Sequence, residues 1–237
     1  MTERMTPSEV VDYPSSDGKP MAENDINRED LTDAVKELAW WFRDRPDVYV
    51  SGDLLIFFIE GDRNQHRAPD VFVTFGVEKK MRDNYKLWEE GPPTVIIEIS
   101  SFSTIKEDTG PKKALYEQWG VSEYYLFDPK GMLLKPPLKG YKLVDGTYVP
   151  LLGPPFHSPA LDLIIFGDGD RLRFKDPVTG TILPTYEEIA HRLESAESRA
   201  ETAESRVEDA ELRAAAAQAR AAALEEELRR LRDGRDK

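Results

Sequence analysis

Apolar positions follow helical spacing first and strand spacing next in the middle of the chain. A helix over 28–43 is predicted, because its apolar residues lie on one face after Asn27: Leu31, Ala34, Val35, Leu38 and Phe42. Runs of β-branched and aromatic residues, bounded by Gly, Pro, Asp or Asn, predict strands over 48–50, 54–60, 71–75 and 94–100. Helical spacing returns over 108–119, with Pro111 in its first turn and Gly120 at its end, and 123–128 has a strand pattern. This order predicts an α/β (α+β) domain.

Composition divides the chain into three parts. Residues 1–23 are polar and have no period, which predicts a disordered tail, and residues 24–183 carry the main domain. Within that domain, strand patterns over 141–144, 148–152, 161–166 and 171–174 predict a small β extension. Residues 184–237 are rich in Ala, Glu, Arg and Leu and predict one long helix, opened by a capping box of Thr185 and Glu188.

The long helix carries a heptad repeat. Position a is occupied by Leu193, Ala200, Val207, Ala214, Ala221 and Leu228, and position d by Ala196, Ala203, Ala210, Ala217, Leu224 and Leu231. Arginines then fall at g and glutamates at e, so two parallel copies would pair opposite charges on both flanks. We therefore expect a homodimer, or a helical partner, through residues 186–232. A solvated single helix is the alternative, because alanine buries little apolar area.

Charge and composition exclude several classes of function. The chain has 45 acidic and 32 basic side chains and a net charge of -13, which excludes a broad, non-specific polyanion binder. It has no cysteine, so disulfides, thiolate nucleophiles and cysteine zinc sites are excluded. No apolar run approaches the roughly 18–20 residues that span a bilayer, and residues 1–23 lack the apolar stretch of a signal peptide. We expect a cytoplasmic protein with no membrane partner.

Two acids lie at positions where a carboxylate is costly. Glu98 interrupts an apolar run that predicts a strand covered on both faces of its sheet. A buried carboxylate needs a partner, so Glu98 must be a metal ligand or part of a buried pair. Asp70 opens the strand of 71–75 after a proline and can point into a cleft, although an ordinary turn acid is the alternative. Carboxylates from two neighbouring strands are a common way to hold Mg²⁺ or Mn²⁺.

The helix that follows Glu98 supplies a third candidate group. Asp108, Lys112 and Tyr116 share one side of it, so Lys112 can lean toward the two acids and stabilise charge that builds on a phosphodiester. The alternative is an exposed ion pair between Asp108 and Lys112, which contributes little. Lys113 is a neighbouring rival, about 100° away around the helix.

These residues together resemble a known family. The motifs are Ala68-Pro69-Asp70-Val71, then Ile97-Glu98-Ile99-Ser100-Ser101, then Asp108, Lys112 and Tyr116, then Gly120-Val121-Ser122-Glu123-Tyr124-Tyr125-Leu126-Phe127-Asp128-Pro129. From about Asn27 to Phe174 the chain is similar to the Uma-two family of restriction endonucleases, within the PD-(D/E)XK nuclease superfamily.

That resemblance implies a mixed β-sheet core flanked by helices and Mg²⁺- or Mn²⁺-dependent hydrolysis of nucleic acid, with DNA as the expected substrate. Asp70 and Glu98 take the acid and metal-binding roles by position. The lysine normally two residues after the second acid is Ser100 here, as is usual in the family, so Lys112 is expected to replace it. Ser100, Asp108 and Tyr116 are expected to support the site.

Phosphate contacts must come from local basic clusters, since the net charge is negative. The candidates are Arg63, His66 and Arg67 before the first acid, and Lys79, Lys80, Arg82 and Lys86 after the next strand. Ordinary solvated loops are an equal alternative for both clusters. Two functions therefore remain open: a metal-dependent endonuclease, or a weak or inactive nuclease-like scaffold that oligomerises through its helix.

Overall fold

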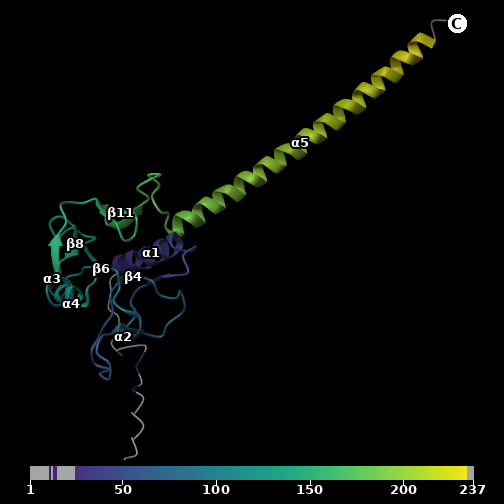
Figure 1. The fold of residues 1–237 in the computed structure, drawn as a ribbon. Helices are drawn as coiled ribbons and strands as arrows, with labels where there is room; N and C mark the ends of the chain where they lie inside the picture. Colours follow the sequence, from purple (N-terminus) through teal and green to yellow (C-terminus); the bar gives the residue numbers. More distant parts are fainter. Residues whose placement is uncertain (1–10, 12, 15–24, 234–237) are drawn as a thin grey trace, which may run out of the picture. The chain divides into compact units, whose positions relative to one another are not determined.

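The computed structural model describes residues 11, 13, 14 and 25–233 of the chain (Figure 1). Its contacts divide the chain into two compact units, residues 1–186 and residues 187–237. The helices are α1 (Asp25–Trp41), α2 (Leu87–Glu90), α3 (Ile105–Thr109), α4 (Pro111–Trp119) and α5 (Tyr186–Asp233). The strands are β1 (Val48–Ser51), β2 (Ile56–Phe57), β3 (His66–Arg67), β4 (Val71–Phe75), β5 (Tyr85–Lys86), β6 (Val95–Ile99), β7 (Glu123–Phe127), β8 (Leu138–Val144), β9 (Thr147–Pro150), β10 (Phe156–Ser158), β11 (Leu163–Asp168) and β12 (Arg171–Lys175).

A six-stranded mixed sheet forms the centre of the first unit. Its order is β1-β4-β6-β7-β8-β9, in which β6 and β7 are parallel and every other neighbouring pair is antiparallel. The strands predicted over 141–144 and 148–152 as part of an extension belong to this sheet, as β8 and β9. The mixed α+β fold predicted from the sequence is confirmed.

Two small sheets accompany the central one. Strands β10, β11 and β12 form an antiparallel sheet that corresponds to the remaining predicted extension. Strands β3, β2 and β5 form the other sheet, with β2 parallel to β5. The strand predicted over 54–60 shrinks to the two residues of β2, because only these two find partners on both sides.

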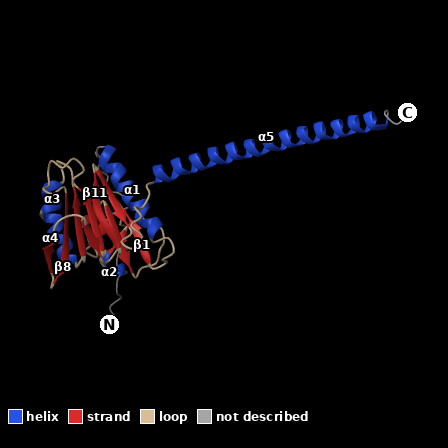
Figure 2. Cartoon of the chain, turned by 90° about the horizontal axis from the view of Figure 1, so that it is seen from above, coloured by secondary structure: helices blue, strands red, loops and turns tan. Residues whose placement is uncertain are grey.

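Side chains of the central strands alternate between two hydrophobic cores. On one face, Val71, Val95 and Ile97 pack with α1 and the β10–β12 sheet. On the other face, Phe72 and Ile96 pack with α4 and the β2–β5 strands. Figure 2 shows the strands lying between α1 on one side and α3 and α4 on the other. The sheet is therefore covered on both faces, which explains why β6 is buried along its whole length.

The helix predicted over 108–119 is divided in two. Gly110 has φ -122° and ψ -97°, outside the helical region, and separates α3 from α4. Pro111 then occupies the first turn of α4, where its missing N–H costs no hydrogen bond. Gly120 ends α4 in the left-handed conformation, at φ 86°, as its sequence position predicts.

Helix α5 is continuous from Tyr186 to Asp233. The seam residues Leu193, Val207 and Leu224 are 58–60% exposed in the single chain. The side chains of Leu228 and Leu231 lie outside the described part. Within the described ranges, no helix is both long enough and apolar enough to cross a membrane.

Part of the segment predicted as a tail is described and packs on the first unit. The Tyr13 ring meets Phe57 edge-on and Trp88 at a tilt, with ring centroids 4.9 and 5.4 Å apart. Its hydroxyl accepts a hydrogen bond from the Gly61 amide at 2.7 Å, and its carbonyl accepts one from Asn84 at 3.0 Å. Within 1–23 only Val11, Tyr13 and Pro14 are described.

Candidate active site

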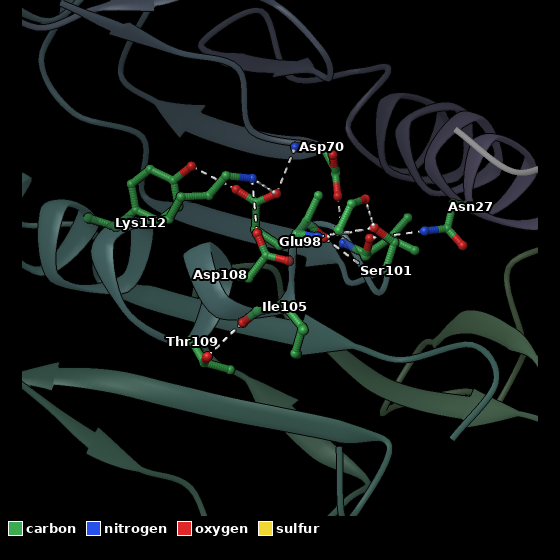
Figure 3. A network of polar contacts seen from close by, with 12 residues as sticks. Asn27, Asp70, Glu98, Ser101, Ile105, Asp108, Thr109 and Lys112 are labelled. Carbon is green, nitrogen blue, oxygen red and sulfur yellow. Dashed lines mark hydrogen bonds and ion pairs between the residues drawn. The ribbon is translucent and has the colours of Figure 1, made fainter. Parts of the chain in front are cut away.

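Asp70 and Glu98 lie opposite each other where β4 begins and β6 ends. The antiparallel register pairs Val71 with Ile97. Asp70, which precedes Val71, therefore lies opposite Glu98, which follows Ile97. The Ile99 amide donates to Asp70 Oδ2 at 2.6 Å, and the Asp70 amide donates to Glu98 Oε2 at 3.4 Å (Figure 3). The two predicted acids therefore meet at one edge of the sheet.

Glu98 is completely buried, and both oxygens of its carboxylate accept hydrogen bonds. Its Oε2 accepts a hydrogen bond from Lys112 Nζ at 3.0 Å, and its Oε1 accepts one from the Tyr116 hydroxyl at 2.7 Å. Burial raises the pKa of Glu98, and the charge of Lys112 opposes that rise. Both partners come from α4, one turn apart, so a single helix fixes the orientation of the carboxylate.

Lys112 lies between two buried carboxylates. Its Nζ is 3.0 Å from Glu98 Oε2 and 3.0 Å from Asp108 Oδ1 (Figure 3). Burial disfavours the ammonium, but Glu98, Asp108 and Asp70 outweigh that effect and raise the pKa of Lys112. Its neighbour Lys113 points elsewhere, with Nζ 4.0 Å from the Tyr141 ring centroid. The structure thus brings only the first of these two lysines to the acids.

Asp108 is a third acid with little access to water. Its side chain is 1% exposed, and among the described residues Lys112 is the one cation in an ion pair with it. Neither carboxylate oxygen meets hydrogen-bond geometry with a described group, although Oδ1 is at ion-pair distance from the ammonium. The surface ion pair considered for Asp108 and Lys112 is therefore a buried one, and buried charges of this kind are typical of functional sites.

Two further residues position this edge of the sheet, and the sequence alone does not indicate that they do so. Asn27 of α1 donates from Nδ2 to the Ile99 carbonyl at 3.3 Å, which ties α1 to the end of β6. A β-carbon on Gly52 would lie 2.2 Å from the Asp70 carbonyl oxygen and 2.8 Å from Val35 Cγ2. Position 52 must therefore be glycine for Asp70 to keep its place, although the sequence shows only a turn residue there.

The first predicted basic cluster precedes Asp70 by a few residues. Arg67 Nη1 donates to the His66 carbonyl at 2.6 Å, and His66 Nδ1 lies 3.2 Å from the Arg63 carbonyl. Arg63 and Arg67 are exposed. These two side chains are therefore accessible to a ligand, and Arg67 precedes Asp70 by three residues.

The second predicted cluster follows the other end of β4, so the five residues of that strand separate it from Asp70. Lys79 Nζ donates to the Phe42 carbonyl at 2.6 Å, and Lys80 pairs with Glu78 at 3.2 Å. Arg82 is engaged most strongly. Its side chain is 3% exposed, it pairs in a fork with Glu90, and it lies 3.9 Å from the Tyr49 ring centroid. Its guanidinium therefore supports the fold and is not presented to a phosphate.

The donor chemistry of the site fits a hard divalent cation. Two carboxylates at one sheet edge are oxygen ligands, and Mg²⁺ is often held by one or two such groups with waters completing its shell. Within the described ranges, no group of three or more His, Asp or Glu side chains is arranged to hold a metal. An ion held by Asp70 and Glu98 would therefore need water or substrate oxygens as its other ligands.

The fold and the site together define a class. A mixed sheet with two acids at its edge and a lysine on the following helix is the arrangement implied by the nuclease resemblance. A family model described as "Uma2: Putative restriction endonuclease" matches residues 8–164. The chain belongs to the Uma2 family, which is a family of nuclease type.

Comparisons with individual proteins add less. One similar solved structure is described as a putative nuclease belonging to DUF820 from Anabaena variabilis ATCC 29413. It is 15% identical, the match covers 60% of this chain and 74% of that chain, and the TM-score is 0.43. No curated protein matches the chain.

Proposed function

We propose that this protein is a divalent-metal-dependent endonuclease that hydrolyses phosphodiester bonds of DNA. The observation that carries the proposal is the buried network in which Lys112 contacts both Glu98 and Asp108 beside Asp70. Burying three charged groups in one network is costly for the fold, so a catalytic role is the reason we give for it. Membership of a nuclease family supports the same conclusion.

Each side chain has a role in this proposal. Asp70 and Glu98 hold Mg²⁺ or Mn²⁺, and the bound ion supplies a Lewis acid for the phosphoryl group. Tyr116 fixes one oxygen of Glu98, which leaves the other oxygen for Lys112 and the ion. Lys112 stabilises the negative charge that builds on the phosphate, and Asp108 holds the ammonium in place. Arg63 and Arg67 contact the flanking backbone phosphates.

Cleavage assays test the enzymatic part. Plasmid, single-stranded DNA and RNA are incubated with and without Mg²⁺ or Mn²⁺, using wild type and the Asp70→Ala, Glu98→Ala double variant. We expect metal-dependent cleavage of DNA by wild type and loss of it in the double variant, with Glu78→Ala as an exposed-acid control. No metal-dependent cleavage of any substrate would favour the scaffold alternative.

A binding measurement separates the metal site from the chemistry. Calorimetric titration of Mn²⁺ into wild type and into the double variant compares their affinities directly. Binding should be lost in the variant, because both proposed ligands are gone. Equal affinity in the two proteins would mean that the ion is held by other residues.

We propose further that α5 pairs with α5 of a second copy. Support comes from the exposed seam residues Leu193, Val207 and Leu224 and from the arginine and glutamate positions that flank the seam. Sedimentation of the full chain tests this with Val207→Asp, Leu224→Asp against Leu212→Asp, since Leu212 is 64% exposed but lies off the seam. The seam variant should be monomeric and the control dimeric. A monomeric wild type, or a dimeric seam variant, would refute the pairing.

A further inference from the structure

We propose that the surface around Phe102 binds an unpaired nucleotide of the substrate strand beside the candidate active site. In this proposal the base stacks on the phenyl ring and an adjoining phosphate meets Lys130. The proposal rests on the proposed function and adds to it the form of the substrate, a strand with at least one base out of its stack.

The location of Phe102 is the first argument. The loop of 100–104 leaves β6 at the end that carries Glu98, and β7 runs parallel to β6, so Asp128 and Lys130 emerge at the same edge. A small cleft joins the two loops there. Its lining includes Asn27, Ser100, Phe102, Asp128, Lys130 and Met132. A nucleotide on this surface would therefore lie at the edge of the sheet that carries the acids.

Phe102 is unusual among the phenylalanines of this chain. All ten lie in the described residues; Phe102 is 70% exposed, and the other nine are buried or partly buried. Hydroxyl contacts hold the loop beneath it. Ser101 Oγ lies 2.8 Å from Ser103 Oγ, and the Ser101 amide donates to Thr104 Oγ1 at 2.9 Å. A ring on a fixed loop loses little freedom when a base stacks on it.

Polar groups in the cleft suit a phosphate. Ser100 is 2% exposed, and its hydroxyl has no hydrogen-bond partner among the described residues. Lys130 is exposed, and no described carboxylate forms an ion pair with it, whereas Lys80 and Lys86 each pair with a glutamate. Asp128 lines the same cleft, but its Oδ2 already accepts two backbone amides, those of residues 133 and 134.

The small cleft and the small exposed apolar surface favour a nucleotide base over a protein partner. The cleft measures about 20 Å³, which accommodates one water or one phosphate oxygen but no base. The base must therefore lie outside, on the exposed ring. Phe102 and Met132 alone, at 70% and 57% exposure, offer far less apolar area than a stable protein interface needs. One aromatic ring is sufficient for one stacked base.

Equilibrium binding by fluorescence anisotropy tests the proposal on the full chain. Two labelled single strands of equal length are compared in Ca²⁺, one of normal nucleotides and one of abasic units. Phe102→Ala should bind the normal strand roughly tenfold more weakly than wild type does, and the abasic strand equally well. Phe102→Trp should retain affinity for the normal strand. Lys130→Ala should weaken binding to both strands, because it removes a phosphate contact.

Met81→Ala and Leu152→Ala are the matched controls, since both side chains are 97% exposed or more and lie on other loops. Unchanged binding of the normal strand by Phe102→Ala, or an equal loss in a control, would overturn the stacking proposal alone. Wild type that binds neither strand would also overturn this proposal, whereas the nuclease function is decided separately by the cleavage of plasmid DNA.

Discussion

Replacing Lys112 should change how strongly the site binds a divalent ion. Its ammonium contacts Glu98 Oε2, an oxygen that the proposed ion also needs, so lysine and metal compete for one carboxylate. Lys112→Met should therefore bind Mn²⁺ more tightly than wild type. Asp108→Asn should bind it more weakly, because the displaced ammonium then has no second carboxylate to retain it.

The distances set the size of the effect. Two unit charges 3.0 Å apart interact by about 5.5 kcal/mol at an effective dielectric constant of about 20. The displaced ammonium keeps its contact with Asp108 and regains some hydration, so we expect about a quarter of that energy to affect binding. About 1.4 kcal/mol corresponds to roughly a tenfold change in Kd.

Calorimetry at pH 8 measures the affinity, and circular dichroism checks that each variant is folded. In the variant that carries both Lys112→Met and Asp108→Asn, the asparagine substitution should lose most of its effect, because the cation that it serves is absent. Weaker Mn²⁺ binding in Lys112→Met would refute the competition. An undiminished effect of Asp108→Asn in the double variant would mean that Asp108 acts on the ion directly.

Three further predictions concern other residues. If cleavage is observed, Lys112→Ala should lower its rate roughly 10²-fold or more, and Lys113→Ala should leave it nearly unchanged. Gly52→Ala should lower both the cleavage rate and the melting temperature, because the added methyl group displaces the Asp70 backbone. A folded variant with the wild-type rate would contradict this. Burial raises the pKa of Asp30 to about 7. The folded state therefore binds a proton that the unfolded state releases, so stability falls as pH rises from about 4 to 7. Asp30→Asn should raise the melting temperature more at pH 8 than at pH 5; an equal change would refute this.

Strong local patterns predicted the centre of the fold and the acids in it. The apolar run around Glu98 predicted a strand covered on both faces, and the structure shows that strand with the Glu98 carboxylate buried in it. Gly120 likewise marked the end of α4, whereas the break at Gly110 that separates α4 from α3 was not predicted. Strand β3 was not predicted, and β2 is shorter than the strand predicted over 54–60, because two residues carry no period and their pairing depends on distant segments.

The remaining differences between prediction and structure depend on which segments and side chains pair with one another in the folded chain. Nothing local indicates that β8 adds to β7 and extends the central sheet. Arginine is a residue type that often binds phosphate, and only the folded chain shows that the Arg82 guanidinium pairs with Glu90. Phe102 and Lys130 are 28 residues apart in sequence, and parallel strands bring them to one edge. Such juxtapositions are properties of the topology.

The bond between the Ile99 amide and Asp70 has a consequence for how sequence relates to activity in this family. Apart from Glu98, strand β6 is apolar toward both cores, so its hydrophobic pattern contributes little to its alignment with β4. The 2.6 Å bond to the Asp70 carboxylate pins that alignment at the end of the pair. A family member without nuclease activity would still lose stability if it lost this aspartate. Retention of Asp70 in a related chain is therefore evidence of a correctly aligned sheet, and cleavage has to be measured separately.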